Sequence, residues 1–231
     1  MLRHLLNSHP HICCHGEVMA GGLKSFTGLE DRPKLPLFVK LHQLRENDPV
    51  SFLRDYVLFP GEMDAVGFKI KYEELVQPAF AAILQCLLAD SELKVIHLRR
   101  RNRMKRVISK VAATRIHGVY NVTDPGQRPA VKRFSLTPAE CLQDFENVSQ
   151  GETKFGGMFA SHPMLEVVYE DLVSPENPVL PAIQQFLEVE PRELLSRTQK
   201  MNPDSISDVI ENYSELSAYF ASTPYAEYFR G

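Results

Sequence analysis

Apolar positions along the chain fall into short runs and into stripes with helical spacing. Short apolar segments at residues 66–70 and 95–98 predict two strands. A stripe at positions i, i+3, i+4, i+7 and i+8 lies between them and predicts a helix over about residues 77–89, with these side chains inward: Phe80, Ile83, Leu84, Leu87 and Leu88. Strand, helix and strand in this order are typical of a parallel sheet with crossover helices. The pattern therefore predicts an α/β fold.

Capping signals and turn residues predict the remaining elements. Asp48 followed by Pro49 is an N-cap with proline at the first helical position, and residues 137–140, Thr-Pro-Ala-Glu, form a capping box. We expect helices over residues 1–8, 48–59 and 137–148, and around residues 183–187 and 206–213. Strands are expected over residues 37–41 and 165–169, and loops over residues 16–36 and 151–163.

The most distinctive segment is the junction where the strand at residues 95–98 runs into a basic helix. Asn102 is a favourable N-cap, and the peptide N–H groups at a helix start attract anions. Arg101 leaves the end of the strand, and Ser109 lies about 10 Å further along the helix axis, within reach of a long guanidinium. Arg101 and Ser109 together predict a phosphate site. The alternative is a solvated helix start beside a surface hydroxyl.

Length and charge narrow the class of protein. The 231 residues, 44% of them hydrophobic, suffice for one well-buried core, so we predict a single domain over residues 1–231. The net charge of −3 argues against binding to nucleic-acid polymers, although six of the eight residues from 99 to 106 are basic. The sequence has neither a run of about 18 apolar residues nor a signal-peptide pattern, so a cytoplasmic protein without a membrane span is expected. The four cysteines are interpreted as reduced thiols.

Three parts of the chain resemble sulfotransferases that use 3′-phosphoadenosine 5′-phosphosulfate (PAPS). Arg101-Asn102, with Ser109 eight residues after the arginine, resembles the motif that binds the donor's 3′-phosphate. Residues 5–12 and the Gly16-Glu17 pair are similar to the helix and turn that follow the phosphosulfate loop in carbohydrate and tyrosylprotein sulfotransferases. Four segments are similar to the C-terminal half of bacterial members: residues 168–172, 186–189, 212–216 and 223–225. Together these parts extend the resemblance over most of the chain, and they occur in the order and spacing of the family.

The resemblance implies a fold and a reaction. The fold is a three-layer parallel sheet flanked by helices, as in P-loop kinases. The reaction is transfer of a sulfuryl group from PAPS, as co-substrate, to a hydroxyl of a carbohydrate, glycolipid or small-molecule acceptor, without a metal. Arg101 and Ser109 would bind the 3′-phosphate, and Glu17 would be the catalytic base, with its pKa raised by a partly desolvated pocket. Glu17 as an ordinary loop carboxylate and His15 as the base are the alternatives.

Two further groups of polar residues have structural interpretations. His9, His11 and His15 with Cys13 and Cys14 suggest a metal at first sight, but a tetrahedral zinc site would need a convergence that the spacing does not provide. Lys69 and Lys71 are interpreted as residues that flank a strand end, and contact with an anionic acceptor is the alternative.

The sequence departs from the family pattern at its beginning. Sulfotransferases carry a strand and a loop of the type Pro-Lys/Arg-Ser-Gly-Thr-Thr before the first helix, and this sequence begins within that helix. The resemblance therefore implies a chain truncated before the phosphosulfate loop and lacking the first, central strand, whose neighbours would have unpaired edges. A non-catalytic nucleotide-binding remnant or interaction protein is the main alternative. A metal-dependent phosphoryl-transfer enzyme is disfavoured because the sequence has no Gly-Lys-Ser/Thr loop. The oligomeric state is left open.

Overall fold

The computed structural model describes residues 1–19, 23, 26–27, 36–118, 130, 132–174, 179–196 and 205–230. Two compact units divide the chain. The first comprises Met1–Leu98, Gly151–Val167 and Asp171–Ser196, and the second comprises Arg99–Gln150, Val168–Glu170 and Arg197–Gly231. This division does not test the prediction of a single domain over residues 1–231.

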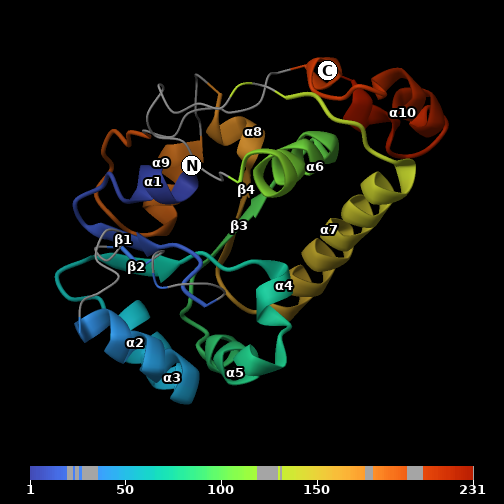
Figure 1. The fold of residues 1–231 in the computed structure, drawn as a ribbon. Coiled ribbons are helices and arrows are strands. Elements are labelled where there is room, and N and C mark those ends of the chain that lie inside the picture. The colour runs from blue at the N-terminus through green and yellow to red at the C-terminus, as the bar shows by residue number, and fades with distance from the viewer. Residues whose placement is uncertain are drawn as a thin grey trace. The chain divides into compact units, whose positions relative to one another are not determined.

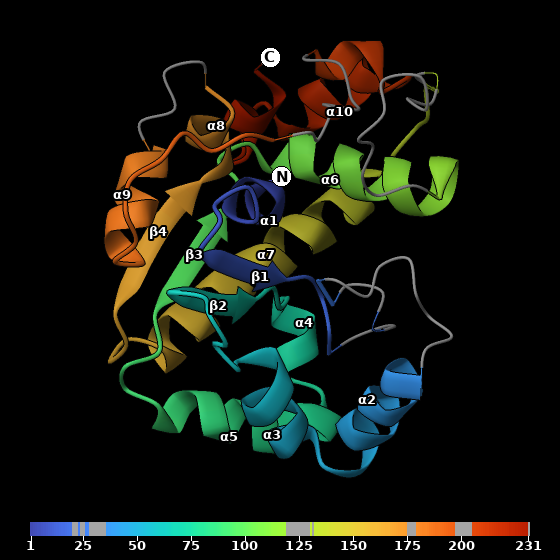
Figure 2. The same cartoon turned by 90° about the vertical axis from the view of Figure 1, so that its left-hand side faces the viewer.

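The four strands of the described part of the chain form two small sheets (Figure 1). Strand β1 (Ile12–His15) pairs in parallel with β2 (Ala65–Phe68), in a register that sets Ile12 opposite Ala65 and His15 opposite Phe68. Strand β3 (Val95–Arg99) pairs with β4 (Met164–Val168), and their arrows run in the same direction in Figure 2. The strands predicted at residues 66–70, 95–98 and 165–169 are thus confirmed within two residues at each end.

The strands of the first unit lie between two apolar clusters. Neighbouring residues of β3 and β4 contribute to different clusters: Val95 and Met164 to one, Ile96 and Leu165 to the other. Because side chains alternate between the faces of a strand, this division places one cluster on each face. The unit is therefore an α/β structure with helices on both sides of the strands (Figure 2).

Different helices supply the two clusters. The first includes side chains of α2 (Pro36–Asn47), α3 (Pro49–Phe52), η2 (Leu53–Val57), α4 (Tyr72–Leu75), η3 (Pro78–Phe80), α5 (Ala81–Ala89) and the end of α7 (Pro138–Met158). The second includes side chains of α1 (Leu2–Leu6), α8 (Tyr169–Leu172) and α9 (Val179–Phe186). Asp48 caps α3 by accepting a 3.0 Å hydrogen bond from the Ser51 amide, as its position before Pro49 predicts.

The second unit has a helical core of its own. It contains α6 (Arg103–Val111), η4 (Ala112–His117), the first part of α7, η6 (Ile206–Asp208), α10 (Tyr213–Phe220) and η7 (Ala226–Phe229). Met104, Phe145 and Phe220 are almost fully buried in this core. None of the described helices is long and apolar enough to cross a membrane.

Three predicted elements are wrong. Residues 37–41 are not a strand but part of α2, whose helix-favouring continuation to Asn47 outweighs the short apolar run and buries Leu41. The loop expected from residue 151 is helical as far as Met158, because α7 continues past its glycines to bury Phe155. The helix expected over residues 206–213 is only the short η6, after which Ile210 forms a bridge with Phe134. The predicted loop over residues 16–36 lies partly outside the described residues.

Candidate functional site

Glu17 lies at the carboxyl ends of two parallel strands. It follows β1 by two residues, and Lys69 directly follows the neighbouring β2. The Lys69 amide donates a 3.0 Å hydrogen bond to the carbonyl of His15, which extends the ladder by one step. Lys69 Nζ lies 2.5 Å from one oxygen of Glu17, and Lys71 Nζ lies 2.6 Å from the other. The parallel register therefore brings a carboxylate and two ammonium groups together where α/β sheets place their ligands.

The two lysines determine the charge of Glu17. Partial burial alone would raise the pKa of the Glu17 carboxyl, but the hydrogen bonds and charges of Lys69 and Lys71 outweigh it and hold the pKa below its ordinary value. The expectation of a raised pKa is therefore wrong for this arrangement. At neutral pH the carboxylate is ionised, so it has the protonation state of a base but a reduced proton affinity.

A second carboxylate lies beside Lys71. Glu74 Oε1 is 3.5 Å from Lys71 Nζ, and Glu74 Oε2 accepts a 3.3 Å hydrogen bond from the Lys71 amide at the start of α4. Only 3% of the Glu74 side chain is exposed, and this burial raises its pKa. Lys71 thus lies between one partly exposed carboxylate and one buried carboxylate.

His15, the alternative base, is held by packing and by a hydrogen bond to the backbone. Its ring is buried and packs against Phe26 with the centroids 4.1 Å apart. Its Nδ1 accepts a 3.0 Å hydrogen bond from the amide of Thr27. Because Nδ1 is engaged by the backbone, the ring is held as part of the packing next to β1, and Glu17 remains the better candidate.

The other histidines near β1 are also held by local contacts. His9 Nε2 lies 2.9 Å from the carbonyl oxygen of Glu190, and its Nδ1 accepts a hydrogen bond from the His11 amide. His11 lies 3.6 Å from Asp64. Among the described residues, no three histidine, cysteine, aspartate or glutamate side chains are placed to hold a metal ion. Burial raises the pKa of Cys14 to about 11, so this free cysteine is a protonated thiol at neutral pH.

In the second unit, the junction between β3 and α6 has the predicted cap. Asn102 is the N-cap of α6, and its side-chain oxygen accepts a 2.9 Å hydrogen bond from the Lys105 amide. An internal carboxylate occupies the helix start. Glu170 accepts hydrogen bonds from the amides of Arg101 at 2.9 Å and Asn102 at 3.2 Å. Glu170 therefore binds the two amides directly before the first residue of α6, Arg103.

The side chains predicted to bind phosphate lie along this helix. Arg101 is exposed just before α6, and Ser109 is half-buried near its end. The amides of Arg101 and Asn102 are bound by Glu170, so the guanidinium is the group of Arg101 that a phosphate could bind. Glu17 belongs to the first unit, and Arg101 and Ser109 belong to the second.

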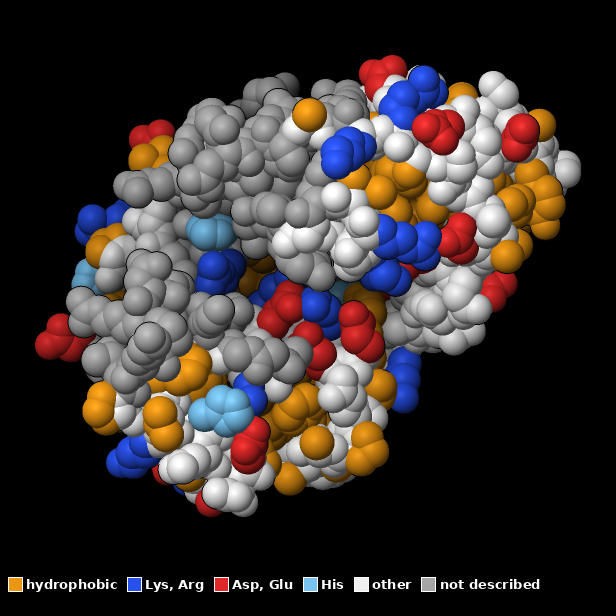
Figure 3. Space-filling view, in the orientation of Figure 1, with side chains coloured by type: hydrophobic (Ala, Val, Ile, Leu, Met, Phe, Trp, Pro, Cys, Tyr) orange, Lys and Arg blue, Asp and Glu red, His pale blue; other side chains and the backbone are white. Residues whose placement is uncertain are grey.

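Several basic side chains near Arg101 have partners within the protein. Arg100 lies over the ring of Tyr169, 4.6 Å from its centroid, and its Nε is 3.7 Å from Glu170. Arg106 forms an ion pair with the buried Asp144. On the face drawn in Figure 3, the described basic side chains are interspersed with acidic ones, which is consistent with the net charge of −3.

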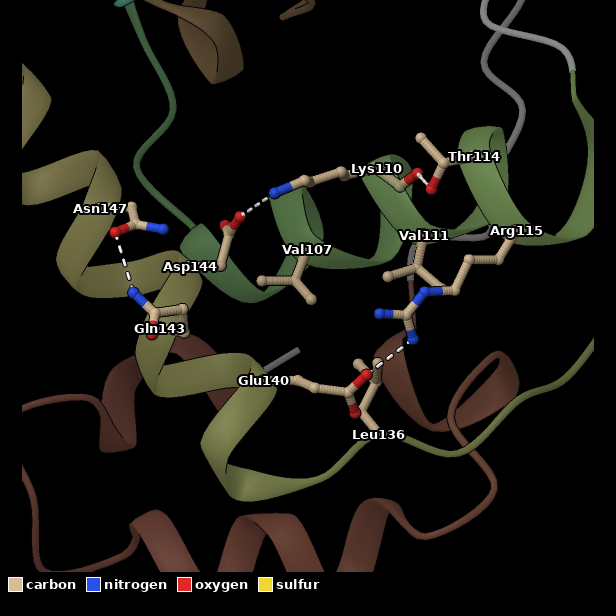
Figure 4. A pocket seen from close by; sticks show the side chains of 10 residues that line it. All are labelled: Val107, Lys110, Val111, Thr114, Arg115, Leu136, Glu140, Gln143, Asp144 and Asn147. Carbon is tan, nitrogen blue, oxygen red and sulfur yellow. Dashed lines mark hydrogen bonds and ion pairs between the residues drawn. The ribbon is translucent and has the colours of Figure 1, made fainter. Parts of the chain in front are cut away.

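A small cavity lies between α6–η4 and α7 in the second unit (Figure 4). Its volume is about 210 Å³, and neither Arg101 nor Ser109 lines it. Lys110 contacts Asp144 at 2.9 Å and Arg115 contacts Glu140 at 2.7 Å across it. Ligand pockets usually measure about 300–1,000 Å³, so this cavity is too small for a nucleotide.

Similarity to known proteins covers nearly the whole chain. The chain is similar to nodulation protein H. It is 27% identical to nodulation protein H of Rhizobium tropici over 232 residues, which cover 99% of this chain and 87% of the relative. It is 25% identical to nodulation protein H of Rhizobium meliloti strain 1021 over 236 residues, which cover 99% and 89%. The similarity to nodulation protein H extends over the three parts of the chain that carry the sulfotransferase resemblance. No family model and no solved structure matches the chain.

Sequence reasoning missed two features of the site. Strand β1 was not predicted, because Ile12–His15 has only one strongly apolar aliphatic residue. Lys69 and Lys71 were interpreted as residues flanking a strand end, whereas both contact Glu17. Their position was a possible signal of a site. Lys69 and Lys71, separated by one residue, come directly after the carboxyl end of a strand.

Proposed function

We propose that this protein transfers a sulfuryl group from PAPS to a hydroxyl of a carbohydrate, glycolipid or small-molecule acceptor. The observation that carries the proposal is the meeting of Glu17 with two ammonium groups at the carboxyl ends of β1 and β2. The similarity to nodulation protein H over 99% of the chain and the Arg101–Ser109 motif agree with it.

The reaction needs a base, cations for the donor, and no covalent intermediate on the protein. Glu17 takes the proton of the acceptor hydroxyl, and the hydroxyl oxygen attacks the sulfur of PAPS. The bond between sulfur and the bridging oxygen breaks, and the 5′-phosphate of the nucleotide keeps the electron pair. Arg101 and Ser109 bind the 3′-phosphate, and lysine ammonium groups offset the charge that grows on the leaving phosphate.

The main alternative is a nucleotide-binding protein of the same fold that does not catalyse transfer. The lowered pKa of Glu17 is the observation that favours it, since a carboxylate held by two cations is a weak base. A transfer assay separates the two functions. Protein incubated with PAPS labelled in its sulfuryl group and a panel of oligosaccharides, glycolipids and small alcohols should yield a labelled acceptor. Nucleotide binding without any labelled product would favour the alternative.

The donor site is tested separately by calorimetry with adenosine 3′,5′-bisphosphate. Arg101→Ala removes a charge-assisted hydrogen bond of about 1.5–3 kcal/mol, so affinity should fall by about 10- to 100-fold. Arg54→Ala is the matched control, because Arg54 is an exposed arginine of η2 in the other unit. Equal affinity in Arg101→Ala and the control would exclude Arg101 from the phosphate site.

A further inference from the structure

Glu17 is held from both sides. Lys69 contacts one of its oxygens at 2.5 Å and Lys71 contacts the other at 2.6 Å, so each carboxylate oxygen faces an ammonium group. The side chain of Glu17 is 27% exposed, which limits how far water can replace these contacts. The charged groups that face it from β2 and α4 are Lys69 and Lys71, with Glu74 behind Lys71.

We call this arrangement the closed state, because Glu17 cannot readily accept a proton while both lysines bind it. Protonating Glu17 while both lysines stay in place would leave two ammonium groups beside a neutral carboxyl group, without the charge that holds them. The lone pairs that must accept the acceptor's proton are also the ones that bind the two lysines. For Glu17 to accept a proton, at least one of the ammonium groups has to move away.

The lysines are able to leave. Lys69 is 55% exposed and Lys71 is 41% exposed, so water can solvate both ammonium groups when they part from Glu17. Lys71 also has a second carboxylate within reach, because Glu74 lies 3.5 Å from its ammonium group. The ammonium can therefore turn from Glu17 without losing all of its opposite charge.

The backbone that carries Lys71 is anchored while its side chain is free to turn. The Lys71 amide is fixed by its hydrogen bond to Glu74. The next residue, Tyr72, donates or accepts a 2.5 Å hydrogen bond with His97 and stacks on Phe155 at 5.1 Å. These contacts hold the start of α4 in place, so exchange of partners involves the lysine side chain and not the helix.

We propose that Lys69 and Lys71 are positioning residues that keep Glu17 closed until an anionic group of the sulfuryl donor draws their ammonium groups away. The inference rests on the proposed function. In the open state the sulfate and phosphate oxygens of the donor take the place of the Glu17 oxygens on the two lysines. Glu17 then accepts the proton of the acceptor hydroxyl as the new oxygen–sulfur bond forms, and the nucleotide phosphate leaves with the electron pair. The base is thus released only when the donor is bound.

The closed state is tested by titrating the Glu17 carboxyl in the intact protein with carbon-13 NMR, with the signal assigned by Glu17→Gln. Lys69→Met and Lys71→Met should each raise the pKa of Glu17, and the double variant should raise it further. Lys69→Arg and Lys71→Arg keep the charge and should restore the wild-type titration, which a merely structural role does not predict. Lys94→Met is the matched control, because Lys94 pairs with Glu188 at 2.7 Å. An unchanged titration in the double variant would overturn the closed state.

The release is tested by adding PAPS to the same samples and by kinetics. In the wild type, bound PAPS should raise the pKa of Glu17. The fall of kcat at acidic pH, which reports the complex, should therefore occur at higher pH than the fall of kcat/KM for the donor, which reports the free enzyme. In the double Lys→Met variant the two falls should coincide. Bound PAPS that leaves the wild-type titration unchanged would overturn this inference alone. Failure of PAPS to bind in calorimetry would overturn the proposed function and the inference together.

Discussion

Glu17 is the residue on which the proposed chemistry depends. Glu17→Gln keeps the size and one hydrogen-bond acceptor but cannot take a proton, so kcat should fall by about 10²–10⁴-fold. Affinity for adenosine 3′,5′-bisphosphate should not fall, because the neutral amide no longer competes with the 5′-phosphate for Lys69 and Lys71. Steady-state assays and calorimetry measure the two quantities. Turnover equal to that of the wild type would remove Glu17 as the base.

Gly151 leaves the space that the ring of Tyr72 occupies. A Cβ atom at residue 151 would lie 2.5 Å from Cδ2 of Tyr72, a ring already held by Phe155 and His97. Gly151→Ala should therefore destabilise the protein by about 1–3 kcal/mol, although alanine is the better helix former by about 1 kcal/mol. Urea unfolding measures the change in the free energy of unfolding.

Gly156 and Gly157 in the same helix provide the matched controls. A Cβ atom at either position would meet nothing within 4 Å. Gly156→Ala and Gly157→Ala should leave stability unchanged or raise it by up to about 1 kcal/mol. A gain in stability for Gly151→Ala as well would contradict the tight contact with Tyr72.

At the scale of elements, the start of α6 is occupied by a carboxylate of the protein itself. Glu170→Gln removes a negative charge next to the arginine that is proposed to bind phosphate. The Arg101 and Asn102 amides bind separate oxygens of Glu170, so the one oxygen that glutamine keeps can accept from only one of them. Affinity for adenosine 3′,5′-bisphosphate should rise by about two- to fivefold, which corresponds to about 0.3–1 kcal/mol for a charge at a helix start.

The control for this prediction is Glu166→Gln on β4. Glu166 belongs to the first unit, where it is 58% exposed and lies 3.7 Å from His97. Calorimetry should give the wild-type affinity for this variant. The same affinity in Glu170→Gln and Glu166→Gln would place the phosphate away from the start of α6.

The elements differ in how well the sequence predicts them. Helix α6 was predicted because its cap is local: Asn102 bonds to an amide three residues away. Helix α2 was mistaken for a strand because its first residues are apolar and only Leu41 among the described side chains is buried, so helical periodicity is weak. The ion pairs of Glu17 join residues more than 50 positions apart. No local pattern encodes such a contact, because it arises from the parallel pairing of β1 and β2.

For the molecule as a whole, acid stability depends on carboxylates with lowered pKa values. Backbone and side-chain hydrogen bonds from Thr137 and the ion pair with Arg115 lower the pKa of Glu140 to about 2. Burial alone would raise the pKa of Asp144, but Arg106 and Lys110 outweigh it and lower the pKa. Both groups have a lower pKa in the folded than in the unfolded chain, where the values are about 4.3 and 3.9. Their contribution to stability is therefore complete above about pH 5 and is lost as pH falls toward 2.

Asp144→Asn tests this acid dependence. At pH 7 the variant should be less stable by about 2 kcal/mol, because Arg106 and Lys110 lose the charge of a partner that is only 7% exposed. The difference from the wild type should shrink as pH falls below 4, since Asp144 of the unfolded wild-type chain then takes up a proton more readily than Asp144 of the folded chain, whose pKa is lowered. Urea unfolding at pH 7, 5 and 3.5 measures both effects. Glu62→Gln, which changes an exposed carboxylate, should leave the stability within about 0.5 kcal/mol at each pH. A loss for Asp144→Asn that is equal at all three pH values would show that packing, rather than charge, accounts for the contribution of Asp144.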